Sequence, residues 1–329
     1  MEWNQRVSRS RMNYIVVDFE WNQSPYGKGS ANKRLPFEII EIGAVKIDAN
    51  GQEIGQFSQI VKPKVYKKLH HITKNLTGIS EKELNAGRPF REVMEEFLAW
   101  CGEDYMFCTW GNLDLLELQR NLKFFHMSDM LKGPITYHNV QKLFRLFYTD
   151  ENNTASLEFA IEYLNIEKKR DFHRAVCDAQ YTADVFLTMD LSEAAKWYTV
   201  DYYQNPKKRK EELKLIYPTY SKYISKEFVN KESAMEDREV RTSRCFACGK
   251  PALKRIRWFV GKNKAYYCLA ECSEHGFLRG KIRIKKSDEG MYFVVKTIRK
   301  VDDEGAKVIV DMKEEVRKKR LEKRHRESK

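Results

Sequence analysis

Long apolar runs are missing from this 329-residue chain, and none approaches the roughly 20 residues of a membrane span. The residues before Ile15 contain no apolar stretch of the length found in signal peptides. Cysteine is scarce: there are seven, an odd number, and four of them lie between positions 245 and 272. An odd, clustered set argues against a disulfide framework and favours reduced thiols with a metal. We therefore expect a cytoplasmic protein that is not embedded in a membrane.

Negative charge is scarce in the second part of the chain. The formal net charge is +13, yet residues 1–200 hold 25 Lys and Arg against 27 Asp and Glu. Residues 201–329 hold 35 against 20. A near-neutral part joined to a strongly basic part indicates that one part holds a polyanion and the other acts on it. A basic tail that serves only solubility is the alternative.

Two carboxylates follow a short apolar run near the start of the chain. The run 15–17 is β-branched and short enough for a buried strand, and Asp18 and Glu20 come directly after it. Because side chains alternate along a strand, Asp18 and Glu20 share one face, and Phe19 and Trp21 share the other. Core packing is therefore favoured for both aromatic rings. Paired carboxylates suit a divalent metal ion, whereas a frayed strand end in solvent is the alternative.

The rest of the first 200 residues alternates between strand and helix patterns. Strands are predicted at 37–47, 54–61, 106–110 and 135–140, a hairpin turn at 48–51, and helices after a capping box at 80–83, from Pro89, from about Asp114, and over 157–164 and 175–191. Strands first and strand–helix alternation afterwards predict an α/β fold, with a mixed β-sheet flanked by helices.

Three further polar residues can join the first two carboxylates. Asp114 falls in the first turn of a helix that follows a strand, where its alternative role is to complement the helix dipole. His173 and Asp178 are five positions apart, which on one continuous helix separates them by roughly 140°. They can share a site only if His173 lies on the loop before the helix.

The order Asp18-x-Glu20, Asp114 and His173-x4-Asp178 resembles the DEDDh 3′–5′ exonucleases, a family with the RNase H-like fold. The resemblance covers residues 12–192, includes softer cues at 41–45 and 76–79, and is greatest with the enhanced-RNAi exonuclease and KapD-like branch.

The resemblance implies a two-metal exonuclease. Asp18, Glu20 and Asp178 would hold one Mg²⁺ or Mn²⁺, Asp18 would bridge to a second ion, and Asp114 would act partly through water. His173 would be the general base, and the products would be 5′-mononucleotides released from a 3′ end. The implied substrate is single-stranded nucleic acid, RNA before single-stranded DNA. A DNA exonuclease of repair or proofreading and a non-catalytic nucleic-acid-binding protein remain alternatives.

The basic part carries a second set of metal-ligand residues. After a charged helical connector expected at 193–243, a module expected at 244–329 begins with Cys245-x2-Cys248-Gly, which is typical of a zinc knuckle. Cys272-x2-His275-Gly repeats that spacing, with Cys268 in reserve as the fourth ligand. The module resembles a zinc ribbon, in which four protein ligands close a structural Zn²⁺ site.

Cations and aromatic residues are interleaved around the predicted zinc ligands. Lys281, Arg283 and Lys285 alternate with apolar residues and should lie on one strand face, and Trp258 and Tyr267 adjoin basic residues. This pattern suits a phosphate backbone, although an ordinary soluble hairpin is the alternative. A basic helix is expected to close the chain.

Overall fold

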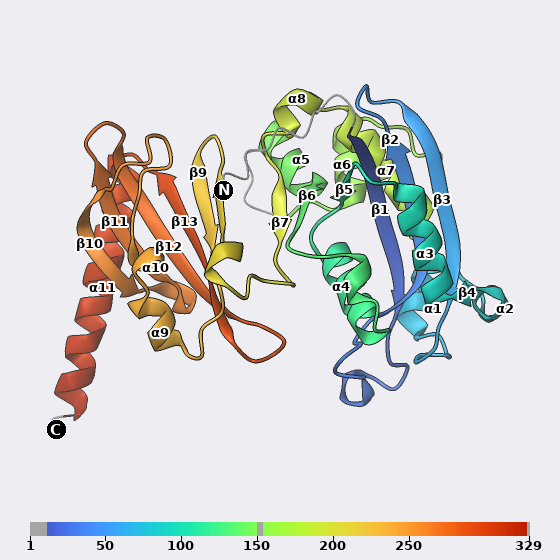
Figure 1. Cartoon of the computed structure of the whole chain (residues 1–329), viewed down its shortest axis with the longest axis horizontal. Coiled ribbons are helices and arrows are strands. Elements are labelled where there is room, and N and C mark those ends of the chain that lie inside the picture. Colours follow the sequence, from blue (N-terminus) through green and yellow to red (C-terminus); the bar gives the residue numbers. More distant parts are fainter. Residues whose placement is uncertain (1–11, 150–153, 328–329) are drawn as a thin grey trace. The chain divides into compact units, whose positions relative to one another are not determined.

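The computed structural model describes residues 12–149 and 154–327, and the chain divides into two units, Met1–Tyr203 and Gln204–Lys329 (Figure 1). The segment before residue 12, where we looked for a signal peptide, lies outside the described residues. Among the helices that are described, none combines the length and the apolar character needed to cross a membrane.

The first unit is built on a mixed sheet, which within the described residues has seven strands in the order β4-β3-β2-β1-β5-β6-β7. β1 pairs antiparallel with β2 on one side and parallel with β5 on the other, so it is a central strand. The strands are β1 (Asn13–Asn22), β2 (Glu38–Ile47), β3 (Glu53–Lys62), β4 (Arg88–Pro89), β5 (Tyr105–Thr109), β6 (Ile135–Asn139) and β7 (Thr199–Asp201).

Local sequence signals set most boundaries of these elements. The hairpin turn between β2 and β3 is present, because the N–H of Gly51 donates to the carbonyl of Asp48 at 3.1 Å. The predicted capping box is also present, with Ser80 and Glu83 each bonded to the other's backbone N–H. The helices of the unit are α1 (His71–Thr77), α2 (Glu81–Ala86), α3 (Phe90–Cys101), α4 (Leu113–Phe124), α5 (Val140–Tyr148), α6 (Leu157–Tyr163), α7 (Ala175–Leu187) and α8 (Leu191–Ala194).

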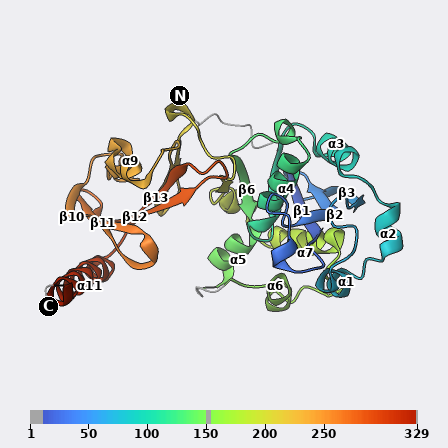
Figure 2. The same cartoon turned by 90° about the horizontal axis from the view of Figure 1, so that it is seen from below.

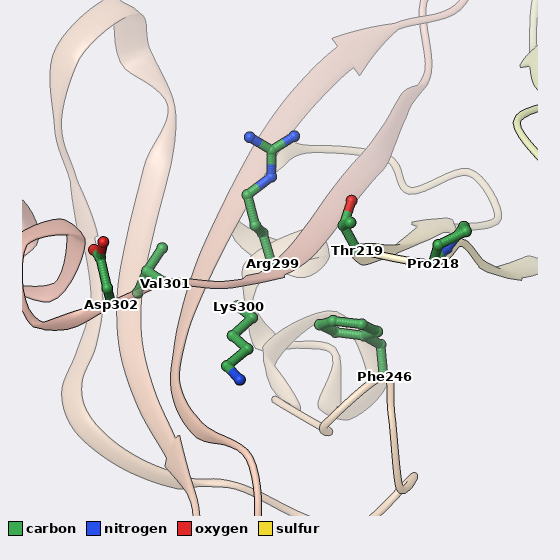
Figure 3. A pocket seen from close by; sticks show the side chains of 7 residues that line it. All are labelled: Pro218, Thr219, Phe246, Arg299, Lys300, Val301 and Asp302. Atoms are coloured by element: carbon green, nitrogen blue, oxygen red, sulfur yellow. The ribbon is translucent and has the colours of Figure 1, made fainter. Parts of the chain in front are cut away.

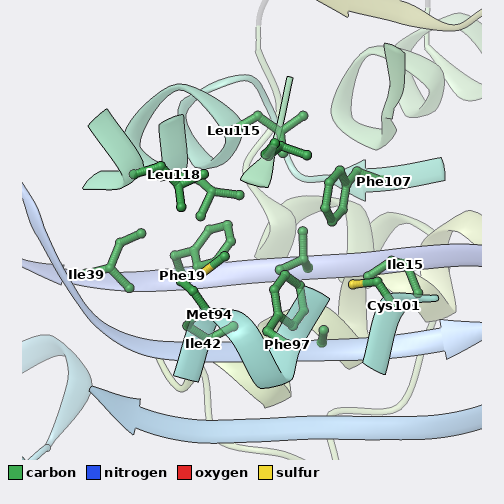
Figure 4. Packing of buried hydrophobic residues seen from close by; sticks show 14 of the residues in the cluster. Ile15, Phe19, Ile39, Ile42, Met94, Phe97, Cys101, Phe107, Leu115 and Leu118 are labelled. Atoms are coloured by element: carbon green, nitrogen blue, oxygen red, sulfur yellow. The ribbon is translucent and has the colours of Figure 1, made fainter. Parts of the chain in front are cut away.

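Helices cover both faces of this sheet, as Figure 2 shows. On one face, Ile15 and Phe19 of β1 pack against Phe97 of α3 and Leu118 of α4 (Figure 4). On the other face, apolar residues of β1 pack against α5, α6 and α7. The predicted mixed sheet flanked by helices is therefore confirmed.

Gly43 of β2 sets how closely α7 approaches the sheet. Gly43 is the partner of Asp18 in the β1–β2 ladder. A Cβ added to Gly43 would lie 2.0 Å from the backbone nitrogen of Val176 and 2.1 Å from the carbonyl carbon of Ala175. No side chain fits in that space, so the first turn of α7 rests on the backbone of β2. This contact brings the start of α7 to the part of β1 that carries the carboxylates.

We expect Gly43→Ala to destabilise the first unit by about 3 kcal/mol or more, because the added methyl group must push α7 off the sheet. The matched control is Gly29→Ala, where an added Cβ meets no atom of the described residues within 4 Å and the cost should stay within about 0.5 kcal/mol. Urea unfolding of the two variants measures the difference. Equal midpoints would contradict the close approach of α7 to β2.

The second unit is a separate antiparallel sheet, which in the described part has six strands in the order β10-β11-β12-β13-β9-β8. Its strands are β8 (Leu213–Ile216), β9 (Tyr220–Ile224), β10 (Leu253–Val260), β11 (Tyr266–Cys272), β12 (Gly276–Lys286) and β13 (Tyr292–Lys300). Its helices are α9 (Lys231–Glu236), α10 (Arg238–Arg241) and α11 (Asp303–Glu327). The predicted β-rich module and closing basic helix are therefore present.

Each face of this second sheet has its own cover. α9 and α10 pack on one face, through Ala234 and Val240, and α11 packs on the opposite face against β10, β11 and β12, through Ala306 and Ile309. The side chain of Lys296 is 6% exposed on the first of these faces and donates to the carbonyls of Glu239 and Thr242 at 2.6 and 2.8 Å. These bonds tie α10 to β13.

The segment 193–243, which we expected to be a connector, is ordered and is shared between the two units. β7 joins the first sheet by pairing with β6, whereas β8 and β9 complete the second sheet beside β13. The second unit therefore starts at Gln204, about 40 residues before the position that we predicted from the cysteine motif. The sequence did not predict β8 and β9, because each alternates polar and apolar residues over only four or five positions. The high charge of the segment made this short pattern harder to recognise.

Candidate active site and Cys/His cluster

Asp18 and Glu20 lie on the face of the first sheet that α7 covers. Val16, on the same strand face, packs with residues of α7, and both carboxylates remain partly exposed. Phe19 points to the opposite face, where it is 3% exposed within the other core, and Trp21 packs at the edge of that core. The prediction that both rings serve core packing is confirmed.

His173 lies on the loop before α7, which is the condition under which it can share a site with Asp178. Its backbone is left-handed, with φ of 66°, and its N–H donates to Oδ2 of Asp178 at 3.0 Å. The ligand atoms of Glu20, His173 and Asp178 all lie within 4.8 Å of one another. The tight turn at His173 thus places the imidazole beside Asp178 in the first turn of α7 and beside Glu20 of β1.

Asp114 reaches the same place from the start of α4. It is 5% exposed, and the backbone N–H of Phe19 donates a hydrogen bond to its carboxyl group. A bond to the β1 backbone between Asp18 and Glu20 fixes Asp114 beside both. The structure thus brings together all five residues predicted for this site. We refer to Asp18, Glu20, Asp114 and Asp178 as the carboxylate cluster.

The carboxylate cluster is electrostatically crowded. Burial, followed by the negative charges of Asp178 and other neighbours, raises the pKa of Glu20 to about 8. Burial also raises the pKa of Asp114 to about 7 and that of Asp178 to about 6, although the N–H of His173 opposes the second shift. The pKa of Asp18 is raised well above its usual range, first by burial and then by Asp114, Glu20 and Asp178.

Divalent cations fit this cluster. Oδ1 of Asp178 is buried and has no hydrogen-bond partner among the described residues, so it is a free acceptor that faces other carboxylates. Hard oxygen donors of this kind are the ligands that Mg²⁺ and Mn²⁺ prefer. A bound cation would also offset the mutual repulsion that disfavours the ionised forms.

The sequence profile of the family described as Exonuclease (RNase_T) matches residues 17–186, which is more than half of the chain and contains the whole cluster. The chain belongs to this exonuclease family. It is a 3′–5′ exonuclease and thus a phosphodiester hydrolase. Nucleases commonly use divalent metal ions, which agrees with the donor set described above.

Three curated proteins illustrate the similarity. The chain is 28% identical to the Bacillus subtilis protein named Probable 3′-5′ exonuclease KapD, over 54% of this chain and 83% of KapD. It is 30% identical to the PolC-type DNA polymerase III of Thermotoga maritima, over 57% of this chain and 15% of the polymerase. It is 25% identical to 3′-5′ exoribonuclease 1 of Rattus norvegicus, over 55% of this chain and 54% of the relative. The chain thus spans most of KapD but about half or less of the other two.

Solved structures support the fold. The nuclease domain of 3′hExo, described as a DEDDh family member bound to rAMP, aligns with a TM-score of 0.50 and 18% identity, over 58% of this chain and 96% of that domain. The RNase H-like exonuclease fold predicted for the first unit is therefore confirmed.

A buried ion pair between Glu41 and Arg174 holds the His173 loop of this exonuclease. The sequence analysis did not predict this pair. Glu41 on β2 is fully buried and is the ladder partner of Glu20. Arg174 donates to its carboxylate through Nε at 3.1 Å and Nη2 at 2.8 Å, and the N–H of Ala175 adds a bond at 3.2 Å. A charged residue inside the apolar strand 38–47 was the signal that could have revealed it, since buried charges need a partner.

Because Arg174 adjoins His173, we expect Arg174→Gln to lower kcat by about 10- to 100-fold while KM for a short oligonucleotide changes little. Arg174→Lys should recover part of the loss, since Lys keeps the charge but not the two-pronged contact. Arg88→Gln is the control, because Arg88 pairs with Glu92 and Glu96 on the surface of α3. A wild-type kcat for Arg174→Gln, measured by steady-state cleavage, would show that the ion pair does not position the loop.

The second unit brings together Cys245, Cys248, Cys272 and His275, whose ligand atoms lie within 4.8 Å of one another; we call them the Cys/His cluster. Sγ of Cys272 is 3.6 Å from Sγ of Cys248 and 3.7 Å from Nδ1 of His275. The edge of a tetrahedron with zinc–sulfur bonds of 2.3 Å is about 3.8 Å. The four groups are therefore spaced as ligands of one tetrahedral ion.

Two tight turns shape the Cys/His cluster. Gly249 and Gly276, which follow the two Cys-x2-ligand pairs, have φ values of 70° and 74°. Bonds from the N–H of Glu274 and from the His275 side chain lower the pKa of Cys272 to about 6, which favours the thiolate that binds metals. Cys268, the reserve ligand, lies apart from the cluster: it is fully buried, and its Sγ is 3.6 Å from Oγ of Ser243.

Proposed function

We propose that this chain is a metal-dependent 3′–5′ exonuclease that releases 5′-mononucleotides from single-stranded nucleic acid, with RNA preferred, and that its second unit helps to hold the substrate. The observation that carries the proposal is the meeting of Glu20, His173 and Asp178 within 4.8 Å, beside Asp18 and Asp114. Side chains from β1, α4, α7 and a strained loop converge there, and no structural need explains such crowding of acids.

Each residue has a distinct role in the proposed reaction. Asp18, Glu20 and Asp178 would hold a Mg²⁺ or Mn²⁺ ion, Asp18 would share a second ion, and Asp114 would assist, in part through water. When bound, the ions supply Lewis acidity at the attacking water and at the leaving 3′ oxygen. The exposed imidazole of His173 would take the proton from that water, the role of general base that histidine fills most often in enzymes.

The preference for RNA rests on the relatives rather than on the pocket chemistry. The rat relative is named an exoribonuclease, which supports RNA. The Thermotoga maritima relative is a DNA polymerase, which supports the second candidate, a DNA exonuclease of repair or proofreading. A non-catalytic nucleic-acid-binding protein is disfavoured, because all five residues of the site are present.

We propose that the Cys/His cluster holds a structural Zn²⁺ ion. Four protein ligands leave no open position on a tetrahedral ion, so the site would support the fold and not the chemistry. The supporting observations are the donor set and its tetrahedral spacing.

Digestion of matched, 5′-labelled RNA and DNA strands tests the proposal. In Mg²⁺ or Mn²⁺ the labelled RNA should shorten stepwise from its 3′ end and release 5′-mononucleotides, and DNA should be degraded more slowly. In EDTA both strands should stay intact. Cleavage in EDTA would remove the metal assignment, and equal rates on the two strands would remove the preference for RNA.

A further inference from the structure

Four cations on one face of the second sheet have no carboxylate partner among the residues that the structure describes: Arg279, Lys281, Arg283 and Arg299. We call them the cationic ladder. Other cations of the same unit are paired, for example Arg209 with Asp237 and Arg255 with Glu271. Surplus cations on one face are the electrostatic mark of a polyanion site.

Strand geometry fixes the arrangement of the cationic ladder. Ile282 and Ile284 of β12 belong to the core beneath α9 and α10, so alternation sends Arg279, Lys281 and Arg283 to the opposite face. This is the face on which α11 packs, and beside the helix Arg279 and Lys281 are half-buried and Arg283 is exposed. Alternate residues on a strand are about 6.8 Å apart. This regular spacing suits successive phosphates of an extended strand.

Arg299 extends the ladder onto β13. It is the direct partner of Arg279 in the β12–β13 ladder, and like charges opposite each other destabilise a sheet. Burial and the neighbouring Arg299 lower the pKa of Arg279. A bound anion would relieve this repulsion.

Buried tyrosines on the adjacent strands flank two of these cations, since Tyr267 is the ladder partner of Lys281 and Tyr220 is that of Arg299. Lys281 lies over the ring of Tyr267 at 5.5 Å and Arg299 over the ring of Tyr220 at 5.8 Å. Tyr267 is 8% and Tyr220 9% exposed, so these rings orient the cations and are not free to stack on bases. Trp258 is also engaged, because its Nε1 donates to the carbonyl of Arg241 at 2.9 Å. The aromatic residues that the sequence associated with nucleic acid thus serve the fold.

A pocket of about 540 Å³ lies where the ladder ends at the end of β13, and Arg299, Lys300, Phe246 and Thr219 are among its lining residues. In Figure 3 the side chains of Arg299 and Lys300 point away from each other, and Phe246 lies on the side of Lys300. Phe246 is half-buried on the turn between Cys245 and Cys248, so the Cys/His cluster holds the ring in place. Phe246 thus lies on the face of β13 opposite Arg299 and the ladder, and an aromatic ring beside a cation such as Lys300 suits a nucleobase and its phosphate.

We propose that the second unit binds a single-stranded segment of the substrate, with its phosphates on the cationic ladder and, where the segment passes around the end of β13, one base in the pocket against Phe246. This deepens the proposed function and rests on it for the identity of the polyanion. The contacts are to the backbone and to one aromatic face, so binding would be tolerant of sequence.

Salt-dependent binding of a fluorescent oligouridine, measured by anisotropy on the full chain, tests the ladder. An Asp18→Asn background keeps the oligonucleotide intact during titration. Replacing Arg279, Lys281 and Arg283 by Gln should lower the slope of log affinity against log salt by about 2, since each single-strand phosphate contact contributes about 0.7. Phe246→Leu should lower affinity by about tenfold without changing that slope.

The matched control replaces Arg317, Lys318 and Arg320 of α11 by Gln, which removes the same residue types and the same charge from an exposed helix. Its slope should equal that of the parent. An equal decrease of the slope in the control would show that binding depends only on net charge and not on the ladder. An unchanged slope in the ladder variant would show that the ladder does not bind phosphates. An unchanged affinity of Phe246→Leu would remove the pocket from the proposal.

Cleavage of a short trinucleotide separates the ladder from the proposed function. With Asp18 restored, the ladder variant should cleave the trinucleotide at the parental rate and lose efficiency only on long strands. If the parental chain cleaves nothing while the ladder still governs binding, the proposed function fails and the ladder stands.

Discussion

Asp18→Asn should lower exonuclease activity by about 10³-fold, because Asp18 is the carboxylate proposed to be shared between two ions, and metal ions contribute several kcal/mol to transition-state stabilisation. The amide keeps the shape of the side chain but loses its charge. The measurement is release of mononucleotides from a labelled RNA strand in Mg²⁺, over a time course long enough to detect a residual rate of that size.

Two comparisons make the Asp18→Asn result specific. Asp129→Asn makes the same chemical change at an exposed position of the first unit and should leave the rate unchanged. In EDTA, Asp18→Asn should raise the thermal midpoint of the first unit, by about 2–4 °C for each kcal/mol of repulsion removed. An inactive variant with a lowered midpoint would point to misfolding, and a variant with the wild-type rate would end the assignment of Asp18.

The site was predictable from sequence because each of its residues is fixed by a local signal. Alternation on β1 places Asp18 and Glu20 on one face, and the left-handed turn at His173 satisfies the one condition that the spacing to Asp178 imposed. The family resemblance supplied the order of the five residues. Tertiary packing brings the helices to β1: the absence of a side chain at Gly43 admits α7, and α4 packs against β1 through Leu115 and Leu118.

Contacts that depend on pairing across strands were not predictable in the same way. Glu41 is placed against Glu20 by the β1–β2 register and is neutralised by Arg174, which lies 133 positions away. Arg299 likewise joins the ladder only through the β12–β13 register. The boundary between the units was predicted too late because the cysteine motif marks the Cys/His cluster and not the start of the sheet that carries it.

Removal of zinc should strongly destabilise the second unit and leave the stability of the first unit unchanged. Structural zinc contributes about 10–16 kcal/mol in small zinc-finger peptides, which matches or exceeds the whole stability of a typical domain, about 5–15 kcal/mol. The Cys/His cluster packs with Ala270, Leu278 and Ile298 of the sheet. We therefore expect Cys245→Ser with Cys248→Ser to lower the thermal midpoint of this unit by more than about 15 °C.

The sheet of the second unit has further cores beneath α9, α10 and α11, so the metal-free unit should be weakened and not wholly unfolded. Trinucleotide cleavage should persist, because the carboxylate cluster belongs to the first unit, whereas binding of long strands should be lost. Calorimetry and cleavage on the same preparation measure both effects. Loss of trinucleotide cleavage together with the zinc would contradict a purely structural site.

Metal content decides which fourth ligand completes the zinc site. The wild-type chain should contain about one zinc ion, and His275→Asn should lose it. Cys268→Ala should retain the ion, because Cys268 lies beside Ser243 and outside the Cys/His cluster. Since Cys268 is fully buried, its substitution also controls for the cost of losing a cysteine from the same sheet. Loss of zinc from Cys268→Ala together with its retention in His275→Asn would reverse the assignment of the fourth ligand. If neither the wild-type chain nor the variants contained zinc, the proposed zinc site would be wrong.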